Sequence, residues 1–234
     1  MENVDGRLPA LAALNEPMRR RLYGYVAAQE SAVSREDAAA TLGMARSVAA
    51  FHLDKLADVG LLQVEYRRPP GRGGPGAGRP AKMYSRAAGE IALSVPERHY
   101  DLAALLLARA VEKAADGSVA VIDALRAVAG EYGRTLGARV NWAEKRSSSS
   151  MERLCGLLAE HGYEPRMAGS TMTLANCPFH TLADEHRELV CGMNYEMIKG
   201  VVQVAGLPDT SANLDPAPGR CCVTLVAKES PDPD

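Results

Sequence analysis

The chain has 234 residues, enough for two small domains or for one domain with an appendage. Hydrophobic residues make up 47% and charged residues 24%, as in ordinary globular proteins, and no apolar run reaches the length of about 18 residues that a transmembrane helix needs. The net charge is −2, so nucleic-acid binding requires a local basic patch. The acidic first residues lack the apolar segment of a secretory signal, so we expect a cytoplasmic protein with no membrane partner.

Aromatic residues are scarce, at 5%, whereas Ala and Leu abound. This composition predicts a mainly α fold with small β elements. Changes in pattern along the chain divide it into three expected parts. These are a winged helix-turn-helix DNA-binding domain at residues 8–88, a helical dimerisation segment at 96–146, and an α+β domain at 151–228 that carries most of the cysteines.

The first part has the pattern of a helix-turn-helix. Apolar residues at helical spacing predict a helix over residues 11–28, in which Pro17 is tolerated only if a helix starts near it. Ser34, with Asp37 three residues later, resembles a capping box and opens a short helix at 35–41. A glycine at position 43 suits a turn with positive φ, and a longer helix follows at 45–59. A short helix, a glycine-bearing turn and a longer helix are typical of DNA-binding proteins.

A basic hairpin follows this motif. Strands predicted at 61–66 and 82–86 enclose a tip rich in Gly and Pro, with no acidic residue from Arg67 to Arg86. Such an arm binds phosphates or enters a minor groove, and the alternative is a loop that only adds solubility. The basic residues of this predicted wing are Arg67, Arg68, Arg72, Arg79, Lys82 and Arg86.

The helix at 45–59 is the predicted recognition helix. Ala49, Leu53 and Leu56 form its expected inward face. The opposite face is expected to enter the major groove of double-stranded operator DNA, with its first residues at the base edges and others on phosphates. The expected contacts are Arg46, Ser47, Ala50 and Lys55, while His52 either contacts DNA or is partly buried.

The segment at 100–115, YDLAALLLARAVEKAA, is apolar on more than one face. A lone amphipathic helix has a single apolar stripe. We therefore expect this segment to be buried at a homodimer interface. The alternative is burial within one chain.

Four of the five cysteines lie in the last quarter of the sequence. An odd number without a secretory context predicts reduced thiols that are available for a metal rather than disulfides. Cys155 lies in an apolar helical pattern and is expected in the core. The remaining thiols are those of Cys177, Cys191, Cys221 and Cys222.

These four cysteines can meet only through tertiary folding. Cys177 is predicted in a loop, Cys191 after a helix at 182–190, and the adjacent pair at the start of a strand that ends at residue 226. Successive side chains of a strand point to opposite faces. One of the pair is therefore expected in the core, and Cys222 is favoured over Cys221 as the ligand.

Thiolates are soft ligands that suit iron–sulfur clusters and zinc. The predicted ligands are Cys177, Cys191 and Cys222, with Cys221, His180 or His186 as the fourth. Nothing in the residue types separates a [4Fe-4S] cluster from Zn²⁺, because three cysteines and a histidine also satisfy a tetrahedral zinc site. Without a metal, the same cysteines can act as redox thiols.

The segment ARSVAAFHLDKLADVGLLQVEYRR, followed by GRPAKMYSR, resembles the ArsR-type winged helix-turn-helix regulators. With NCPFHTLADEHRELVCGMNYEMIKGV and LDPAPGRCCVTL added, the chain resembles the subgroup that includes the repressor of the suf iron–sulfur assembly operon. The resemblance covers most of residues 10–227. It implies a homodimer that carries an iron–sulfur cluster, binds an operator and represses cluster-assembly genes when it is loaded.

The leading hypothesis is therefore a transcriptional repressor controlled by an iron–sulfur cluster. The second is a winged-helix regulator that responds to a small organic ligand or zinc, with structural or redox-active cysteines. The third is an enzyme in which Cys177, His180 and Asp184 imitate a nucleophile, a base and an orienting acid. Because no phosphate loop, nucleophile elbow or His-Glu-x-x-His helix supports catalysis, we do not expect an enzyme.

Overall fold

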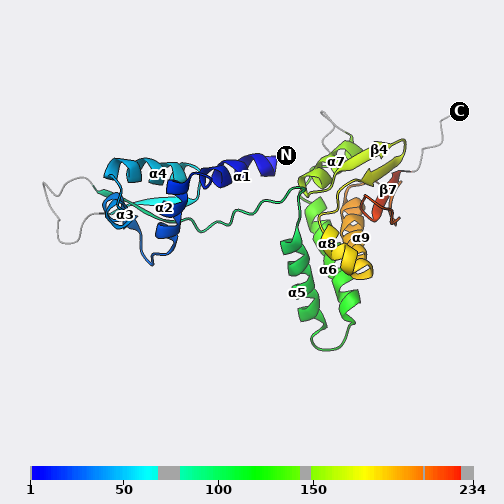
Figure 1. Ribbon diagram of the computed structural model, residues 1–234. Helices are drawn as coiled ribbons and strands as arrows, with labels where there is room; N and C mark the ends of the chain where they lie inside the picture. Colours follow the sequence, from blue (N-terminus) through cyan, green and yellow to red (C-terminus); the bar gives the residue numbers. More distant parts are fainter. Residues whose placement is uncertain (1, 68–79, 143–148, 208, 228–234) are drawn as a thin grey trace. The chain divides into compact units, whose positions relative to one another are not determined.

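The computed structural model of the protein describes residues 2–67, 80–142, 149–207 and 209–227. The chain divides into two compact units, Met1–Leu93 and Ser94–Asp234, and each is described by itself. Both are mainly helical with small antiparallel sheets, which confirms the predicted fold class (Figure 1). Within the described ranges, no helix is both long enough and apolar enough to cross a membrane.

The first unit packs helices against an antiparallel sheet with the strand order β1-β3-β2. Its core is formed mainly by aliphatic side chains of the helices and by Tyr84 of β3. The elements are α1 (Glu2–Ala13), α2 (Pro17–Ala27), β1 (Val33–Ser34), α3 (Arg35–Leu42), α4 (Arg46–Asp58), β2 (Leu62–Arg67) and β3 (Ala81–Arg86).

The single helix predicted at 11–28 is wrong, because α1 and α2 are separate helices. Pro17 is the first residue of α2, where its fixed φ and missing N–H fit. In the interior of a continuous helix the same proline would remove a backbone hydrogen bond. The Glu16 carboxylate caps α2 by accepting hydrogen bonds from the backbone N–H groups of Met18 and Arg19, at 3.0 and 2.6 Å.

Helices α3 and α4 form the predicted helix-turn-helix. The Ser34 hydroxyl accepts a hydrogen bond from the N–H of Asp37, and the Asp37 carboxylate accepts one from the N–H of Ser34, so the capping box is confirmed. Gly43 ends α3 with φ +66°, a conformation that glycine adopts without strain. Local backbone chemistry thus sets both the start and the end of α3.

The second unit combines a helical layer with an antiparallel sheet of strand order β4-β5-β7-β6 (Figure 1). Its elements are α5 (Tyr100–Ala114), α6 (Val121–Gly137), α7 (Ser150–Glu160), β4 (Pro165–Ala168), β5 (Thr171–Leu174), α8 (His180–Glu185), α9 (Arg187–Val204), β6 (Thr210–Leu214) and β7 (Val223–Ala227).

Helices α6 and α9 pack with their backbones in contact. A Cβ on Gly133 would lie 1.9 Å from the carbonyl oxygen of Met197, and one on Gly200 would lie 2.3 Å from the carbonyl oxygen of Gly130. Glycine is therefore required where the two helices cross. This contact joins α6 to the helix that carries Cys191.

The predicted dimerisation segment belongs to the same compact unit as the cysteines. The apolar surface of α6 is buried against α9 inside the chain. In contrast, α5 leaves Leu105 and Val111 exposed. Dimerisation through α5 stays a prediction.

Two predicted boundaries near the cysteines are shifted. The helix predicted at 182–190 is interrupted at His186, where φ −127° and ψ 51° separate α8 from α9. Cys191 therefore lies in the second turn of α9 and not after a helix. The strand β7 begins at Val223, so Cys221 and Cys222 precede it.

Candidate functional site

Helix α4 has one buried face and one exposed face. Ala49, Leu53 and Leu56 are buried in the core of the first unit, which confirms the predicted inward face. Ala50 is partly buried beside them. The exposed face carries Arg46, Ser47, Val48, Phe51 and Lys55.

Two apolar residues of this exposed face escaped the sequence analysis. Phe51 is 57% exposed and Val48 is 39% exposed. The sequence could have indicated their exposure, since both lie outside the inward-facing stripe of Ala49, Leu53 and Leu56. Apolar side chains on a recognition helix contact thymine methyl groups in the major groove.

Several predicted DNA-binding cations have acidic partners in the first unit. Arg46 Nε lies 2.5 Å from Glu36 Oε1, Lys55 Nζ lies 3.6 Å from the Asp58 carboxylate, and Arg67 Nη2 lies 2.6 Å from the Glu65 carboxylate. All these side chains are exposed. Exposed ion pairs stabilise a fold by only about 0–1 kcal/mol, so a phosphate can replace the acidic partner at little cost.

Lys82 lies in a tighter arrangement around Asp54 of α4. The Asp54 carboxylate accepts hydrogen bonds from Lys82 Nζ, from the Tyr84 hydroxyl at 2.6 Å and from Arg35 Nη2 at 3.0 Å. Burial raises the pKa of Asp54, but these donors lower it by more, so its pKa is below the ordinary value. Asp54 thereby joins α3, α4 and β3. The positive charge of Lys82 is paired with Asp54 within the domain.

His52 is mostly buried, with 15% of its side chain exposed. Its Nδ1 lies 3.6 Å from the Glu16 carboxylate that caps α2. Of the two alternatives for His52, this position fits the partly buried imidazole. The predicted wing residues Arg68, Arg72 and Arg79 lie outside the described residues, whereas Arg86 ends β3 and is exposed.

The second unit brings four cysteines to one cavity of about 260 Å³. Cys177 comes from the loop after β5, Cys191 from α9, and Cys221 and Cys222 from the segment before β7. One water molecule needs only about 10–15 Å³ of such a volume, so the cavity has room for a larger group.

Both Cys221 and Cys222 line the cavity. Both also belong to the buried core of the unit, so the expected preference for Cys222 as the ligand stays a prediction. Strand alternation applies only from Val223 onward, where β7 begins. Gly219, with φ +73°, bends the chain just before the pair. Cys221 is the deepest, at 1% exposure, and its Sγ accepts a hydrogen bond from Asn194 Nδ2 at 3.2 Å.

The pKa values of the four thiols are coupled between neighbours in the order Cys177, Cys221, Cys222, Cys191. The hydrogen bond with Cys221 and burial raise the pKa of Cys177. At Cys221 the bond with Cys177 lowers the pKa, but the bond with Cys222 and burial outweigh it and raise the pKa to about 12. The bond with Cys191 raises the pKa of Cys222 to about 12, whereas that bond lowers the pKa of Cys191.

A buried polar chain lies behind Cys221. Asn194 is one turn after Cys191 on α9, so it faces the same side of the helix. Its Oδ1 accepts a hydrogen bond from the Tyr163 hydroxyl, and burial raises the pKa of that phenol well above its ordinary value. Asn194 and Tyr163 were missed by the sequence analysis, although the three-residue spacing from Cys191 pointed to Asn194.

The other predicted ligands lie less favourably. His180 lines the cavity but is exposed, with its Nε2 3.5 Å from the Asp184 carboxylate. His186 is exposed at the break before α9 and does not line the cavity. Cys155 of α7 packs against the core, as expected, and does not line the cavity either.

The donor set of the cavity fits an iron–sulfur cluster. Four thiols supply the four ligands that such clusters use, and Arg187 and Arg220 also line the cavity, where they oppose the negative charge of thiolates. Among the described residues, no group of three or more His, Cys, Asp or Glu side chains is arranged to hold a single metal ion. That arrangement matters less for a cluster, because each iron takes its own thiolate, than for zinc, whose ligands meet at one ion.

A family model described as a helix-turn-helix domain matches residues 14–65. No curated protein and no solved structure matches the chain. The matched range runs from the turn before α2 to β2 and includes the whole exposed face of α4. The first unit is thus a helix-turn-helix domain, which indicates that the protein is a DNA-binding transcription regulator.

Proposed function

We propose that the protein is a transcriptional repressor whose affinity for its operator is controlled by an iron–sulfur cluster bound to Cys177, Cys191, Cys221 and Cys222. The single observation that supports this best is the convergence of four thiols from three distant segments on one cavity. The resemblance to the ArsR-type regulators, and to the suf repressor subgroup within them, suggests iron–sulfur assembly genes as the target.

The protein's own residues suggest how loading changes the unit. When bound, the cluster supplies a centre that is sensitive to iron, oxygen and redox state. Its four ligands join the loop after β5, the second turn of α9 and the segment before β7. Because the high pKa values of Cys177, Cys221 and Cys222 keep these thiols protonated at neutral pH, loading has to release their protons.

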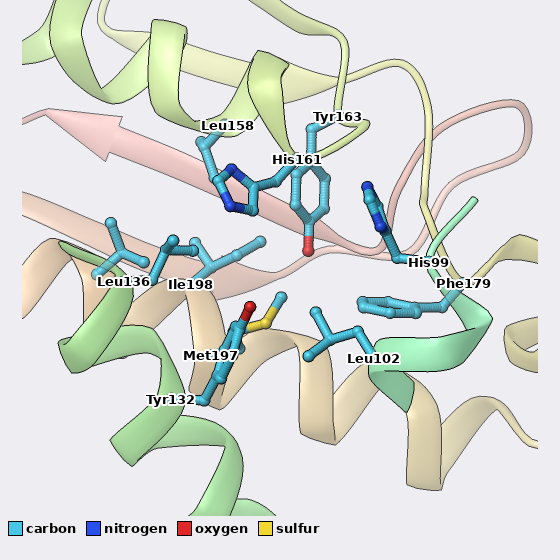
Figure 2. A pocket seen from close by; sticks show the side chains of 11 residues that line it. His99, Leu102, Tyr132, Leu136, Leu158, His161, Tyr163, Phe179, Met197 and Ile198 are labelled. Carbon is cyan, nitrogen blue, oxygen red and sulfur yellow. The ribbon is translucent and has the colours of Figure 1, made fainter. Parts of the chain in front are cut away.

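One apolar cavity of the second unit does not support the alternative of a small organic effector. The apolar cavity shown in Figure 2, between Tyr132, Tyr163, Phe179 and Met197, has a volume of only about 10 Å³. A single water molecule needs about that much space. This cavity is therefore too small for an organic ligand.

The repressor is proposed to act as a homodimer. Leu105 and Val111 on α5 are exposed and available to contact a second copy. A two-fold dimer reads half-sites about one helical turn apart, so small changes in the separation of its recognition helices reduce affinity. Loading of the cysteine cavity is proposed to set this separation.

The proposal is tested by comparing apo protein with protein reconstituted anaerobically with iron and sulfide. The probe is a duplex that the loaded protein selects from a random-sequence pool. We expect the loaded protein to bind it about 5- to 150-fold more tightly, the usual range of allosteric coupling. Equal affinity of the two forms would contradict control by a cluster and leave only the DNA-binding function.

Phe51→Ala is expected to weaken binding to the selected duplex by about 1–3 kcal/mol, because the exposed ring loses its contact with the bases. The loss should be selective: replacing thymine by uracil at the contacted position should weaken the wild-type protein and leave the variant unchanged. Lys55→Ala is the comparison, since removing a phosphate contact lowers the salt dependence of binding. If Phe51→Ala binds as tightly as wild type, the ring does not contact bases.

A further inference from the structure

The chain enters the second unit directly against the loop that carries Cys177. Arg98 lies five residues after Leu93, the last residue of the first unit. Its Nη1 donates hydrogen bonds to the backbone oxygen of Cys177 at 3.2 Å and to Oδ1 of Asn176. One guanidinium nitrogen therefore holds both the backbone of a predicted cluster ligand and the side chain before it.

Asn176 completes the junction from the side of the loop. It is a buried polar side chain, and its Nδ2 donates to the backbone oxygens of Glu97 at 3.1 Å and Gly162 at 2.5 Å. Arg98 thus donates to Asn176 and to the backbone of Cys177, and Asn176 donates to the backbone of Glu97, the residue before Arg98. A buried amide whose donors and acceptor are all used holds a defined position.

Two more contacts extend this junction. The N–H of His99 donates to the backbone oxygen of Pro178 at 3.0 Å, and the Tyr100 hydroxyl donates to Thr181 Oγ1 at 2.9 Å. Figure 2 shows the His99 and Phe179 rings beside each other at the start of α5, where both line the small apolar cavity. The segment 97–100 therefore follows the Cys177 loop residue by residue, from Asn176 to Thr181.

We propose that Arg98 and Asn176 are the positioning residues that couple the Cys177 loop to the connection between the two units. This inference rests on the proposed function. Ligation of Cys177 orders its loop, and the ordered loop holds residues 97–100 through the bonds described above. The point at which the chain leaves toward the DNA-binding unit is thereby fixed only in the loaded state. Without ligation, both the Cys177 loop and residues 97–100 are more mobile.

The test uses full-length Arg98→Met, which keeps the length of the side chain and removes its donors. Arg166→Met is the matched control, because Arg166 is exposed on β4 and its guanidinium pairs with nearby Glu164. The readouts are iron and sulfide per chain and the ratio of apo to loaded dissociation constants for the selected duplex. We expect Arg98→Met to keep its cluster while this ratio falls toward one, and Arg166→Met to keep the wild-type ratio.

A second measurement needs no variant. Amide hydrogen exchange at residues 97–100 of the wild-type protein should be slower in the loaded form, because the His99 N–H donates to the Cys177 loop. Equal exchange in both forms overturns the coupling, even if Arg98→Met loses its cluster or fails to fold. So does a loaded Arg98→Met protein with the wild-type affinity ratio. A wild-type ratio of one instead contradicts the proposed function itself.

Discussion

Gly133→Ala is expected to lower the free energy of unfolding of the second unit by about 3 kcal/mol, the upper end of the range for overpacked cores. The added methyl group would lie 1.9 Å from the carbonyl oxygen of Met197 and 2.8 Å from its carbonyl carbon. A backbone carbonyl cannot rotate away as a flexible side chain can, so α6 and α9 have to separate. Urea unfolding followed by circular dichroism measures the loss.

Gly156→Ala is the control for this prediction. Gly156 lies on the exposed side of α7, and a Cβ there has no other atom within 4 Å. Because alanine favours helix over glycine by about 0.5–1 kcal/mol, this variant should be as stable as wild type or more stable. If Gly133→Ala unfolds at the same urea concentration as Gly156→Ala, the close contact between α6 and α9 does not exist.

Serine substitution at Cys177, Cys191 or Cys222 is expected to remove most of the iron and sulfide from the reconstituted protein. Each substitution takes one thiolate from the cavity, and a hydroxyl is a poor ligand for iron–sulfur clusters. The affinity for the selected duplex should then fall to that of the apo protein. Iron and sulfide assays, visible absorbance and a DNA-binding titration measure these effects.

The fourth ligand is tested by two further variants. Cys221 is buried in the cavity, whereas His180 is exposed at its edge and lies beside Asp184. Cys221→Ser is therefore expected to lose the cluster and His180→Ala to keep it. Cys155→Ser should also keep it, since Cys155 lies outside the cavity. Retention of iron by Cys221→Ser together with its loss from His180→Ala would assign the histidine instead.

Local features of the first unit could be predicted because each depends on neighbouring residues. The capping box of Ser34 and Asp37 and the turn at Gly43 follow from short-range backbone chemistry. The buried stripe of α4 follows from helical periodicity. The apolar spacing continues across Pro17 and favoured one helix, whereas the missing N–H of Pro17 required a helix start nearby, which is where α2 begins.

The cysteine cavity could be predicted only in part. The candidate ligands were identified by residue type, but their order around the cavity depends on long-range packing. Because β7 begins one residue later than expected, strand alternation does not apply to Cys221 and Cys222, and both line the cavity. The bonds from Arg98 to Asn176 and Cys177 span almost 80 residues, so no local pattern could indicate them.

The glycine contact between α6 and α9 also has a mechanical consequence. With the two backbones touching, no side chain lies between them at the crossing point that could repack to absorb a displacement. Shear of α9 along α6 would require the helices to lift apart, so the pair is stiff in that direction. A displacement of α9 at Cys191 is therefore expected to displace α6 as well, so that the two helices move together.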